Sequence, residues 1–400
     1  MPVSQTAPAT QPTHSLWAAF VPLLPLMLVT FIGFFPSGMV FPVLPLHLHG
    51  ALGQGTVMIG VVMGSQYASS LFARLWAGEV TDGRGARLAS LAGMLGISGV
   101  GVMYLVSLLF DDQPELAVGV LIAARLLTGM AESFVITATL SWGIARVGPA
   151  HAGKVIGWIG VALFAGYAAA APLGVALHAR FGWLGIALAT VIVPLAGLAC
   201  ARAVAPIAPS AVERLPFYRV IGAIKLPGVG LTLCATGYAM ITAFVALLFA
   251  QHGWGSGALA FTSMGAGFIA SRLLLGHLPD QLGGARVALY CLVGEAIGLL
   301  LIWGAPGPLV ACVGAVLAGA GYALGFQGFG VEAVRRTPPQ SRGSAMGAYV
   351  AFQDISMGLA APLGGLLAQA AGLDAVYLAG AVAALGAAVV AAVMLRMPAP

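Results

Sequence analysis

The sequence predicts an all-α membrane protein with twelve transmembrane helices in two pseudo-symmetric six-helix bundles. Three observations carry this prediction: the composition, the length of the apolar blocks and an internal repeat. Of the 400 residues, 60% are hydrophobic and 7% are charged, and the mean hydropathy is +1.00. A soluble domain carries about 25% charged residues, which keep its surface hydrated. This chain has too few charges to cover even one globule in water.

The apolar residues run in blocks of about 20, the length that a helix needs to cross a hydrocarbon core of about 30 Å. Polar turns separate twelve such blocks. Prolines inside them are compatible with helices in lipid, where neighbouring helices support the kinks. The expected spans are residues 17–40, 55–79, 87–110, 116–143, 153–178, 182–204, 222–250, 257–279, 286–304, 308–334, 343–369 and 373–396.

The basic residues predict the orientation. With the N-terminus inside the cell, the inner connections and the C-terminal tail hold thirteen Lys and Arg residues, whereas the outer connections hold only Arg180. This asymmetry follows the positive-inside rule, so we expect both termini to be cytoplasmic. It also accounts for the net charge of +5 without a nucleic-acid partner. The expected parts are tails at 1–16 and 397–400, bundles at 17–204 and 222–396, and a cytoplasmic linker at 205–221.

An internal repeat supports the two bundles. The stretch from Gly78 to Arg87 returns half a chain later as the stretch from Gly276 to Arg286. Further matches at near-equal offsets pair Arg74 with Arg272, Gly129 with Gly319, Gly153 with Gly343, Gly157 with Gly347, Pro172 with Pro362 and Gly174 with Gly364. Two repeated halves joined by an inner connection are the layout of one class of secondary transporter, whose substrate path lies between the repeats.

The repeated turn resembles the loop signature G-x-x-x-D-R-x-G-R-R/K of the major facilitator superfamily. The first copy matches it at Gly78, Asp82, Gly85 and Arg87. It departs at Gly83, where the family has Arg, and at Ala86, and Arg84 is the candidate to supply the missing charge. The second copy keeps Gly276, Asp280 and Gly283, with Arg286 displaced by one residue.

Two further stretches carry the resemblance. In the fourth expected helix, Arg125 and Gly129 resemble the family's R-x-x-x-G signature, and Ala171–Gly174 in the fifth resembles a degraded antiporter signature, G-x-x-x-G-P-x-x-G-G. Residues 330–358 are similar to a bacterial subgroup labelled YhhS/YfcJ-like, whose members are described as sugar- or drug-efflux permeases. The resemblance covers essentially the whole chain.

For the two turns the resemblance implies a cytoplasmic gate, which Asp82 and Arg87 would hold closed through contacts between the bundles. Contacts that must break and re-form suit partly solvated pairs. We expect Arg74 to extend to the inner surface beside Asp82, and Glu332 to form an interfacial salt bridge. The residues assigned to this gate are Gly78, Asp82, Arg84, Arg87, Gly276, Asp280, Arg286, Arg74, Arg272, Glu332 and Arg335.

Four charged residues lie in the interior of the expected spans and outside the repeat, and for one of them, Glu295, the sequence suggests no role. A charge at the bilayer centre costs about 2.5–3.5 kcal/mol on insertion scales. Arg125 and Glu132 lie two turns apart on one helix face, and Asp354 lies near the middle of the eleventh span. Neither acid recurs in the other half, which indicates a task such as proton exchange. A buried ion pair that only fixes helix packing remains the alternative.

Other side chains could line a cavity with these charges, although an aromatic residue in a membrane helix more often serves packing. The candidates are Gln353, Gln327, Tyr67, Trp158 and Tyr349. His47 and His49 are two residues apart and would point in different directions on a helix, so we expect no metal site. The chain has no P-loop motif and no defensible catalytic Ser/His/Asp set, and we expect no enzyme and no cofactor.

These features predict a secondary active transporter of a small organic molecule, with alternating access driven by a proton gradient. Efflux of a sugar- or drug-like substrate is the leading interpretation. The alternatives are a proton-coupled symporter or facilitator that imports a nutrient, and a non-transporting receptor. We expect a monomer in the bacterial inner membrane, with protons, the substrate and the lipid bilayer as its partners.

Overall fold

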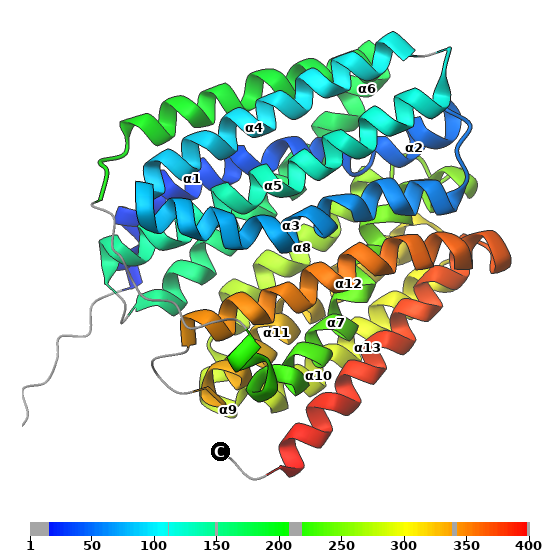
Figure 1. The fold of residues 1–400 in the computed structure, drawn as a ribbon. Coiled ribbons are helices and arrows are strands. Elements are labelled where there is room, and N and C mark those ends of the chain that lie inside the picture. Colours follow the sequence, from blue (N-terminus) through cyan, green and yellow to red (C-terminus); the bar gives the residue numbers. More distant parts are fainter. Residues whose placement is uncertain (1–15, 111, 149–150, 208–217, 338–341, 398–400) are drawn as a thin grey trace, which may run out of the picture.

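The computed structural model describes residues 16–397 except 111, 149–150, 208–217 and 338–341, and every regular element in these residues is helical (Figure 1). The expected tails and most of the expected linker lie outside the described residues. The helices are α1 (Leu16–Val40), α2 (Leu44–Gly50), α3 (Thr56–Arg84), α4 (Ala86–Ser107), the 3-10 turn η1 (Leu108–Phe110), α5 (Pro114–Val147), α6 (Ala152–Ala203), α7 (Tyr218–Gln251), α8 (Ala258–Leu275), α9 (Leu278–Leu282), α10 (Gly284–Trp303), α11 (Pro308–Arg335), α12 (Arg342–Ala371) and α13 (Leu373–Arg396).

The described residues contain eleven segments that are long and apolar enough to cross a membrane. One of them, α6, has 52 residues and is about 78 Å long at 1.5 Å per residue, more than twice the hydrocarbon thickness. Its helical conformation breaks at Gly182, where φ is 61° and ψ is −155°. Glycine adopts this conformation without a steric penalty. Divided at Gly182, α6 gives two spans, which brings the total to the twelve that the sequence predicts.

The two repeated turns have the same backbone conformation. Gly85, between α3 and α4, has φ 96° and ψ 146°, and Gly283, between α9 and α10, has φ 90° and ψ 139°. A side chain at either position would strain the backbone, because residues other than glycine rarely adopt positive φ. The repeat therefore preserves the bend that reverses the chain direction after each of these helices.

Matching helices also touch at matching residues. A Cβ atom added to Gly129 of α5 would collide with the carbonyl of Gln66 on α3. A Cβ atom added to Gly319 of α11 would collide with the carbonyl of Met264 on α8. Small residues allow this close backbone approach between membrane helices.

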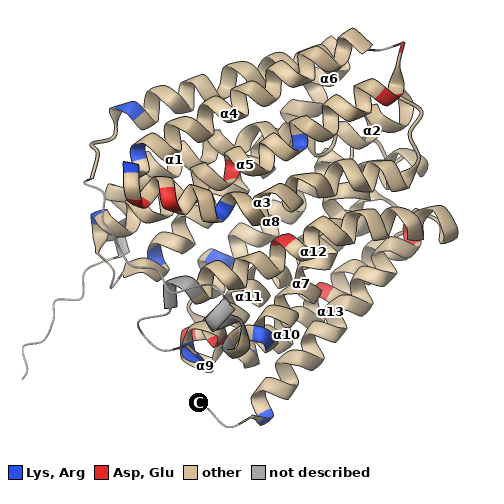
Figure 2. Ribbon diagram, viewed as in Figure 1, with Lys and Arg blue, Asp and Glu red and all other residues tan. Residues whose placement is uncertain are grey.

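The charges distinguish the two ends of the molecule (Figure 2). We call the end that carries the turns at Gly85 and Gly283 the basic end, because Arg84, Arg87 and Arg286 lie there. We call the opposite end the acidic end. It carries Asp112, Glu115 and Asp374 at or next to the starts of α5 and α13.

Helices α1–α6 pack against helices α7–α13 along two main contacts, α3 with α12 and α6 with α8 (Figure 1). Toward the acidic end both contacts are close. Thr56 Oγ1 donates a hydrogen bond to the carbonyl of Gly365 at 2.7 Å, and Thr262 Oγ1 donates one to the carbonyl of Ala168 at 3.0 Å. Gly60 also lies against the backbone of Ala361.

Toward the basic end the same helices diverge. Gly347 lies three turns before Gly358 on the same face of α12, and Gly157 lies three turns before Ala168 on α6. A Cβ atom added to Gly347 or to Gly157 would meet no atom within 4 Å. The space between the two groups of helices therefore widens from the acidic end to the basic end.

Candidate functional site

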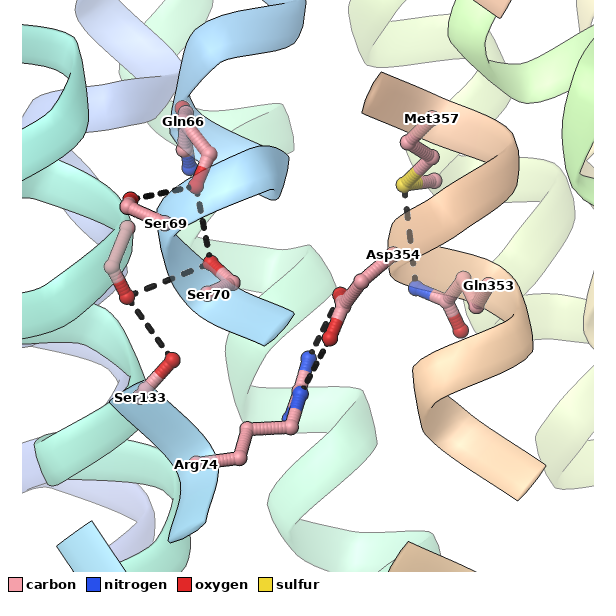
Figure 3. Close-up of polar contacts among 9 residues, drawn as sticks. Gln66, Ser69, Ser70, Arg74, Ser133, Gln353, Asp354 and Met357 are labelled. Atoms are coloured by element: carbon pink, nitrogen blue, oxygen red, sulfur yellow. Dashed lines mark hydrogen bonds and ion pairs between the residues drawn. The ribbon is translucent and has the colours of Figure 1, made fainter. Parts of the chain in front are cut away.

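An ion pair joins α3 to α12 at the point where these helices begin to diverge. Arg74 Nε lies 2.5 Å from Asp354 Oδ2, and Arg74 Nη2 lies 2.9 Å from Asp354 Oδ1 (Figure 3). The Asp354 side chain is 1% exposed and that of Arg74 is 26% exposed. Two-point pairing of this kind is the strong form of an arginine–carboxylate contact. The pair links residues 280 positions apart and so connects the two groups of helices.

This pairing differs from the sequence-based expectation for Arg74. We expected its side chain to extend to the basic end beside Asp82, but it extends sideways to α12. An unpaired carboxylate between membrane helices is costly, and a guanidinium within reach offsets that cost by pairing with it. The internal repeat gave no indication of this contact, because Arg74 recurs as Arg272 whereas Asp354 does not recur.

Glu132 lies in a separate polar contact between α5, α1 and α3. Ser37 Oγ donates a hydrogen bond to Glu132 Oε1, and Gln66 Nε2 donates one to Oε2, each at 2.5 Å. The residue is 5% exposed. Both carboxylate oxygens thus have uncharged hydrogen-bond donors, and Arg125, two turns away on the same helix, is not one of them.

The sequence interpretation missed Ser37 and Gln66. A signal for Gln66 was present, because Gln66, Ser70 and Arg74 follow one another at intervals of four in an apolar span and therefore share one helix face. Ser70 Oγ donates to the carbonyl of Gln66 and lies 3.2 Å from the carbonyl of Gly129, which ties this face to α5 (Figure 3). No comparable pattern surrounds Ser37, since serines are compatible with many positions in membrane helices.

Arg125 lies two turns from Glu132 toward the acidic end and is 0% exposed. Its Nε, Nη1 and Nη2 atoms have no hydrogen-bond partner among the described residues. Its Cζ atom lies 5.6 Å from the centre of the Phe41 ring, within the range of a cation–π contact. The half-buried Tyr67 lies within electrostatic range of Arg125, Glu132 and Asp354. The two acids and two arginines consequently belong to one electrostatic network.

A series of aromatic rings extends from Phe41 across the interface between the two groups of helices. Ring centres are 5.0 Å apart for Phe41 and Tyr167, 5.9 Å for Tyr167 and Phe164, 5.9 Å for Phe164 and Tyr238, and 4.8 Å for Tyr238 and Tyr322. We call these five residues the aromatic series. It places apolar ring surface between the arginine on α5 and the helices α7 and α11.

The other expected cavity residues make contacts that do not include Arg74, Arg125, Glu132 or Asp354 among the hydrogen bonds and ring contacts of the described residues. Tyr349 is 0% exposed and its hydroxyl donates to the carbonyl of Phe326 at 2.6 Å. Gln327 Nε2 donates to the carbonyl of Gly276 at 2.7 Å, and Gln353 Nε2 lies 3.8 Å from the sulfur of Met357 on its own helix. Trp158 packs on Phe20 with ring centres 4.7 Å apart. Their role in binding stays a prediction.

At the first repeated turn, Arg87 Nη2 donates to the carbonyl of Arg202, within α1–α6. In this conformation its hydrogen bond therefore does not cross between the two groups of helices as we expected. Arg84 and Arg87 line a hollow of about 420 Å³ together with Pro206. Gly78 is buried within α3.

At the second repeated turn, Glu332 is the central residue. Its Oε1 accepts a hydrogen bond from the backbone N–H of Ala285 and lies 3.5 Å from Arg335 Nη1, and its Oε2 lies 3.7 Å from Arg336 Nε. Arg286 borders the same hollow as these groups. Asp280 is exposed on α9, and Nη1 of the half-buried Arg272 has no hydrogen-bond partner among the described residues.

Glu295 was the one mid-span acid without a sequence interpretation. It lies on α10 at 0% exposure, and Cys234 Sγ on α7 lies 3.5 Å from its Oε2. Its other oxygen has no hydrogen-bond partner among the described residues. The contact belongs to the packing of α7 on α10 and is separate from the Arg74–Asp354 pair.

A long helical chain with eleven to twelve candidate spans is a multi-pass membrane protein, and charged side chains enclosed between its helices are typical of a transport path. The family model of the Major Facilitator Superfamily matches residues 26–260 and 227–400. The chain belongs to this family. The fold and the relatives are those of transporters, which are not enzymes.

Similar sequences occur in several bacteria. A protein of Pseudomonas aeruginosa is 40% identical over 364 residues, which cover 91% of this chain and 90% of the relative. A protein of Salmonella typhimurium is 39% identical over 361 residues, covering 90% and 93%. One of Burkholderia mallei is 37% identical over 386 residues, covering 95% and 94%. All three are described as uncharacterized MFS-type transporters.

Two solved structures have a similar fold. A mutant of the nucleoside transporter NupG superposes with a TM-score of 0.75 at 14% identity, covering 93% of this chain and 99% of that one. The human organic anion transporter MFSD10 (TETRAN) superposes with a TM-score of 0.67 at 17% identity, covering 95% and 100%. At these identities the likeness concerns the fold alone.

Proposed function

We propose that this protein is a proton-coupled secondary transporter that exports a small organic molecule by alternating access. In this proposal helices α1–α6 and helices α7–α13 form the two six-helix bundles of a duplicated chain. These bundles correspond to the expected ranges 17–204 and 222–396. Both termini and the basic end face the cytoplasm of the bacterial inner membrane. The protein works as a monomer, and it belongs to the YhhS/YfcJ-like efflux subgroup. Sugar- or drug-like compounds are the substrate class.

The observation that carries the proposal is the Arg74–Asp354 pair between α3 and α12. A proton that binds Asp354 removes the charge that holds Arg74, so the contact between the bundles weakens. The helices are close toward the acidic end and separated toward the basic end. A rocking motion that closes the basic end and opens the acidic end would release a substrate on the other side.

Glu132 is the second candidate for proton exchange. Removal from water favours the neutral form of a carboxyl group, whereas donors and nearby cations favour the charged form. Glu132 has two donors and lies near Arg125 and Arg74, so a rearrangement of α1 or α3 would alter its charge. Substrate and proton would then compete for one electrostatic network.

Two fold relatives are described as transporters of nucleosides and of organic anions, which supports a small organic substrate. The proposed direction of transport rests on the APLG stretch of α6, Ala171–Gly174. Import by a proton symporter or by a facilitator is the alternative, and the same fold serves both directions.

Everted membrane vesicles with an imposed pH gradient, acidic inside, would test the proposal. Candidate compounds are added to vesicles containing this protein, and proton efflux is followed with a pH-sensitive dye. An exporter that exchanges protons accumulates its substrate in the vesicles and releases protons, whereas a proton symporter moves the substrate outward. Asp354→Asn should abolish both movements.

The matched control for this experiment is Asp374→Asn. Asp374 lies at the acidic end, half exposed, where His252 Nε2 is 3.3 Å from its Oδ1. The control removes one carboxylate but leaves the interface between α3 and α12 unchanged, so it should exchange normally. Wild-type exchange in both Asp354→Asn and Glu132→Gln would contradict the assignment of proton coupling to these residues.

A further inference from the structure

Arg125 is a buried cation whose side chain has no hydrogen-bond partner among the described residues. All three of its nitrogen atoms lack hydrogen bonds within the described part of the chain, and the residue is 0% exposed. Buried polar groups almost always have a hydrogen-bond partner, so a buried exception calls for an explanation such as a functional role. A guanidinium also cannot avoid the problem by losing its proton, because it stays charged in proteins.

Among the described residues, no carboxylate forms a hydrogen-bonded ion pair with this guanidinium. The nearest acid on its own helix, Glu132, takes its hydrogen bonds from Ser37 and Gln66. Asp354 is paired in two-point geometry with Arg74. The two acids of the network thus have other partners, and the described contact of Arg125 is the face of the Phe41 ring.

We propose that Arg125 binds the anionic group of the transported molecule, and that this molecule is a small organic anion with an aromatic or apolar body. This inference rests on the proposed transport function and narrows its substrate class. Five N–H donors in a planar fork match the oxygens of a carboxylate or phosphate. The adjacent aromatic series, which begins at Phe41 and continues to Tyr167 and Phe164, supplies ring surface for the body of the molecule.

The same geometry indicates how an exported anion leaves Arg125. Phe41 covers the guanidinium and stacks on Phe261 of α8, with ring centres 6.2 Å apart and planes at 14°. This stack joins the two groups of helices toward the acidic end, where they are close together. An anion that binds from the basic end neutralises the charge of Arg125. Separation of the helices toward the acidic end then breaks the stack and opens the way for the anion to leave.

Thermal unfolding of the purified protein in detergent tests this inference. The probes are benzoate and 3-phenylpropionate, each compared with its uncharged amide, together with phenyl phosphate, acetate and chloride at equal ionic strength. Specific binding to the folded state raises the unfolding midpoint. The ring-bearing anions should raise the midpoint by several degrees and the amides should leave it unchanged. Equal shifts with acids and amides, equal shifts with chloride, or no shift with any anion would each overturn the inference.

Substitutions locate the effect. Arg125→Gln should abolish the shift caused by ring-bearing anions, and Arg125→Lys should weaken the affinity at least tenfold, because an ammonium lacks the fork. The matched control is Arg180→Gln, which removes an arginine that lies over Phe181 in the same type of ring contact. That variant should bind as the wild type does. An unchanged anion shift in Arg125→Gln would refute the assignment.

A measurement without ligand separates binding from a structural role. Arg125→Met replaces the cation with an apolar side chain of similar length, and it should raise the midpoint of the ligand-free protein. A lower midpoint would identify a structural partner of Arg125 and would overturn the inference. If Arg125→Gln does not fold, the comparison of acids with amides on the unchanged protein still tests whether it binds ring-bearing anions.

The outcomes also separate this inference from the proposed function. If the protein binds anions at Arg125 but exchanges no protons, the inference about Arg125 is supported and the proposed proton coupling is contradicted. If only neutral or cationic compounds drive proton exchange, the proposed function is supported and the anion site at Arg125 is contradicted.

Discussion

Asp354 of α12 and Phe164 of α6 occupy equivalent positions of the internal repeat, and each lies in the contact between the two groups of helices. Asp354 pairs with Arg74 of α3, whereas Phe164 stacks on Phe268 of α8 with ring centres 3.5 Å apart. Equivalent positions of the two halves thus make interface contacts of different chemistry. A proton can alter the first and cannot alter the second.

A double-substitution cycle at the charged contact is the first prediction. Arg74→Gln leaves Asp354 as a buried carboxylate without its partner, which should reduce stability by about 3 kcal/mol. Asp354→Asn should cost less, because Arg74 is partly exposed. The double variant Arg74→Gln/Asp354→Asn should regain most of the loss, since no charge is then unpaired. The stability of all four proteins is compared through their unfolding midpoints in detergent. Strictly additive losses would contradict a direct interaction between Arg74 and Asp354.

The aromatic contact gives the second prediction. Phe164→Ala removes ring contacts to Phe268 and Tyr238, and it should reduce stability by about 3 kcal/mol, as large-to-small changes in packed sites do. Its transport, measured per folded molecule, should keep its dependence on the pH gradient. A Phe164→Ala protein that transports at a rate independent of the gradient would show that this contact also takes part in coupling.

The third prediction concerns Glu132 and its donor Ser37. Glu132→Gln has no titratable proton, so the transport rate should lose its response to pH. Ser37→Ala removes one hydrogen bond, worth about 1 kcal/mol, and keeps the carboxyl group, so a pH-dependent rate should remain. The two variants are compared by measuring the initial rate of transport in vesicles over a range of external pH. A flat profile in Ser37→Ala, which keeps the carboxyl group, would contradict the assignment of the pH response to Glu132 alone.

Most of the fold was predictable from the sequence, because apolar block length and glycine repeats are local signals. The turn at Gly85 and its copy at Gly283 confirm this, since both have the positive φ that makes glycine necessary. The break at Gly182 also falls where two spans were expected to meet. The partner of Asp354 was not predictable. It lies 280 residues away, and whether a long arginine side chain extends to the membrane surface or to a neighbouring helix depends on packing.

The candidate site was predictable only in its charged members. Arg125, Glu132 and Asp354 were evident because charges are rare in membrane spans. Ser37 left no pattern in the sequence, and the spacing of Gln66 marked a polar helix face without showing that this face meets Glu132. The reason is general, since uncharged polar residues cost little in such helices and leave no strong pattern.

The last prediction tests whether the divergence toward the basic end is one state of a moving interface. Gly157 of α6 and Gly347 of α12 face open space here, so Gly157→Leu and Gly347→Leu should leave the unfolding midpoint unchanged. If the basic end must close during transport, the added side chains obstruct it and transport should fall at least tenfold.

Two further glycines calibrate this experiment. Gly129 and Gly319 already lie against the carbonyls of Gln66 and Met264, so even Gly129→Ala and Gly319→Ala should destabilise the protein by about 1–3 kcal/mol, as overpacking does. Gly148→Leu would not serve as a control, because its φ of 89° would add backbone strain. Normal transport by both leucine variants would mean that the faces of α6 and α12 do not approach other helices at the basic end in any step of the cycle.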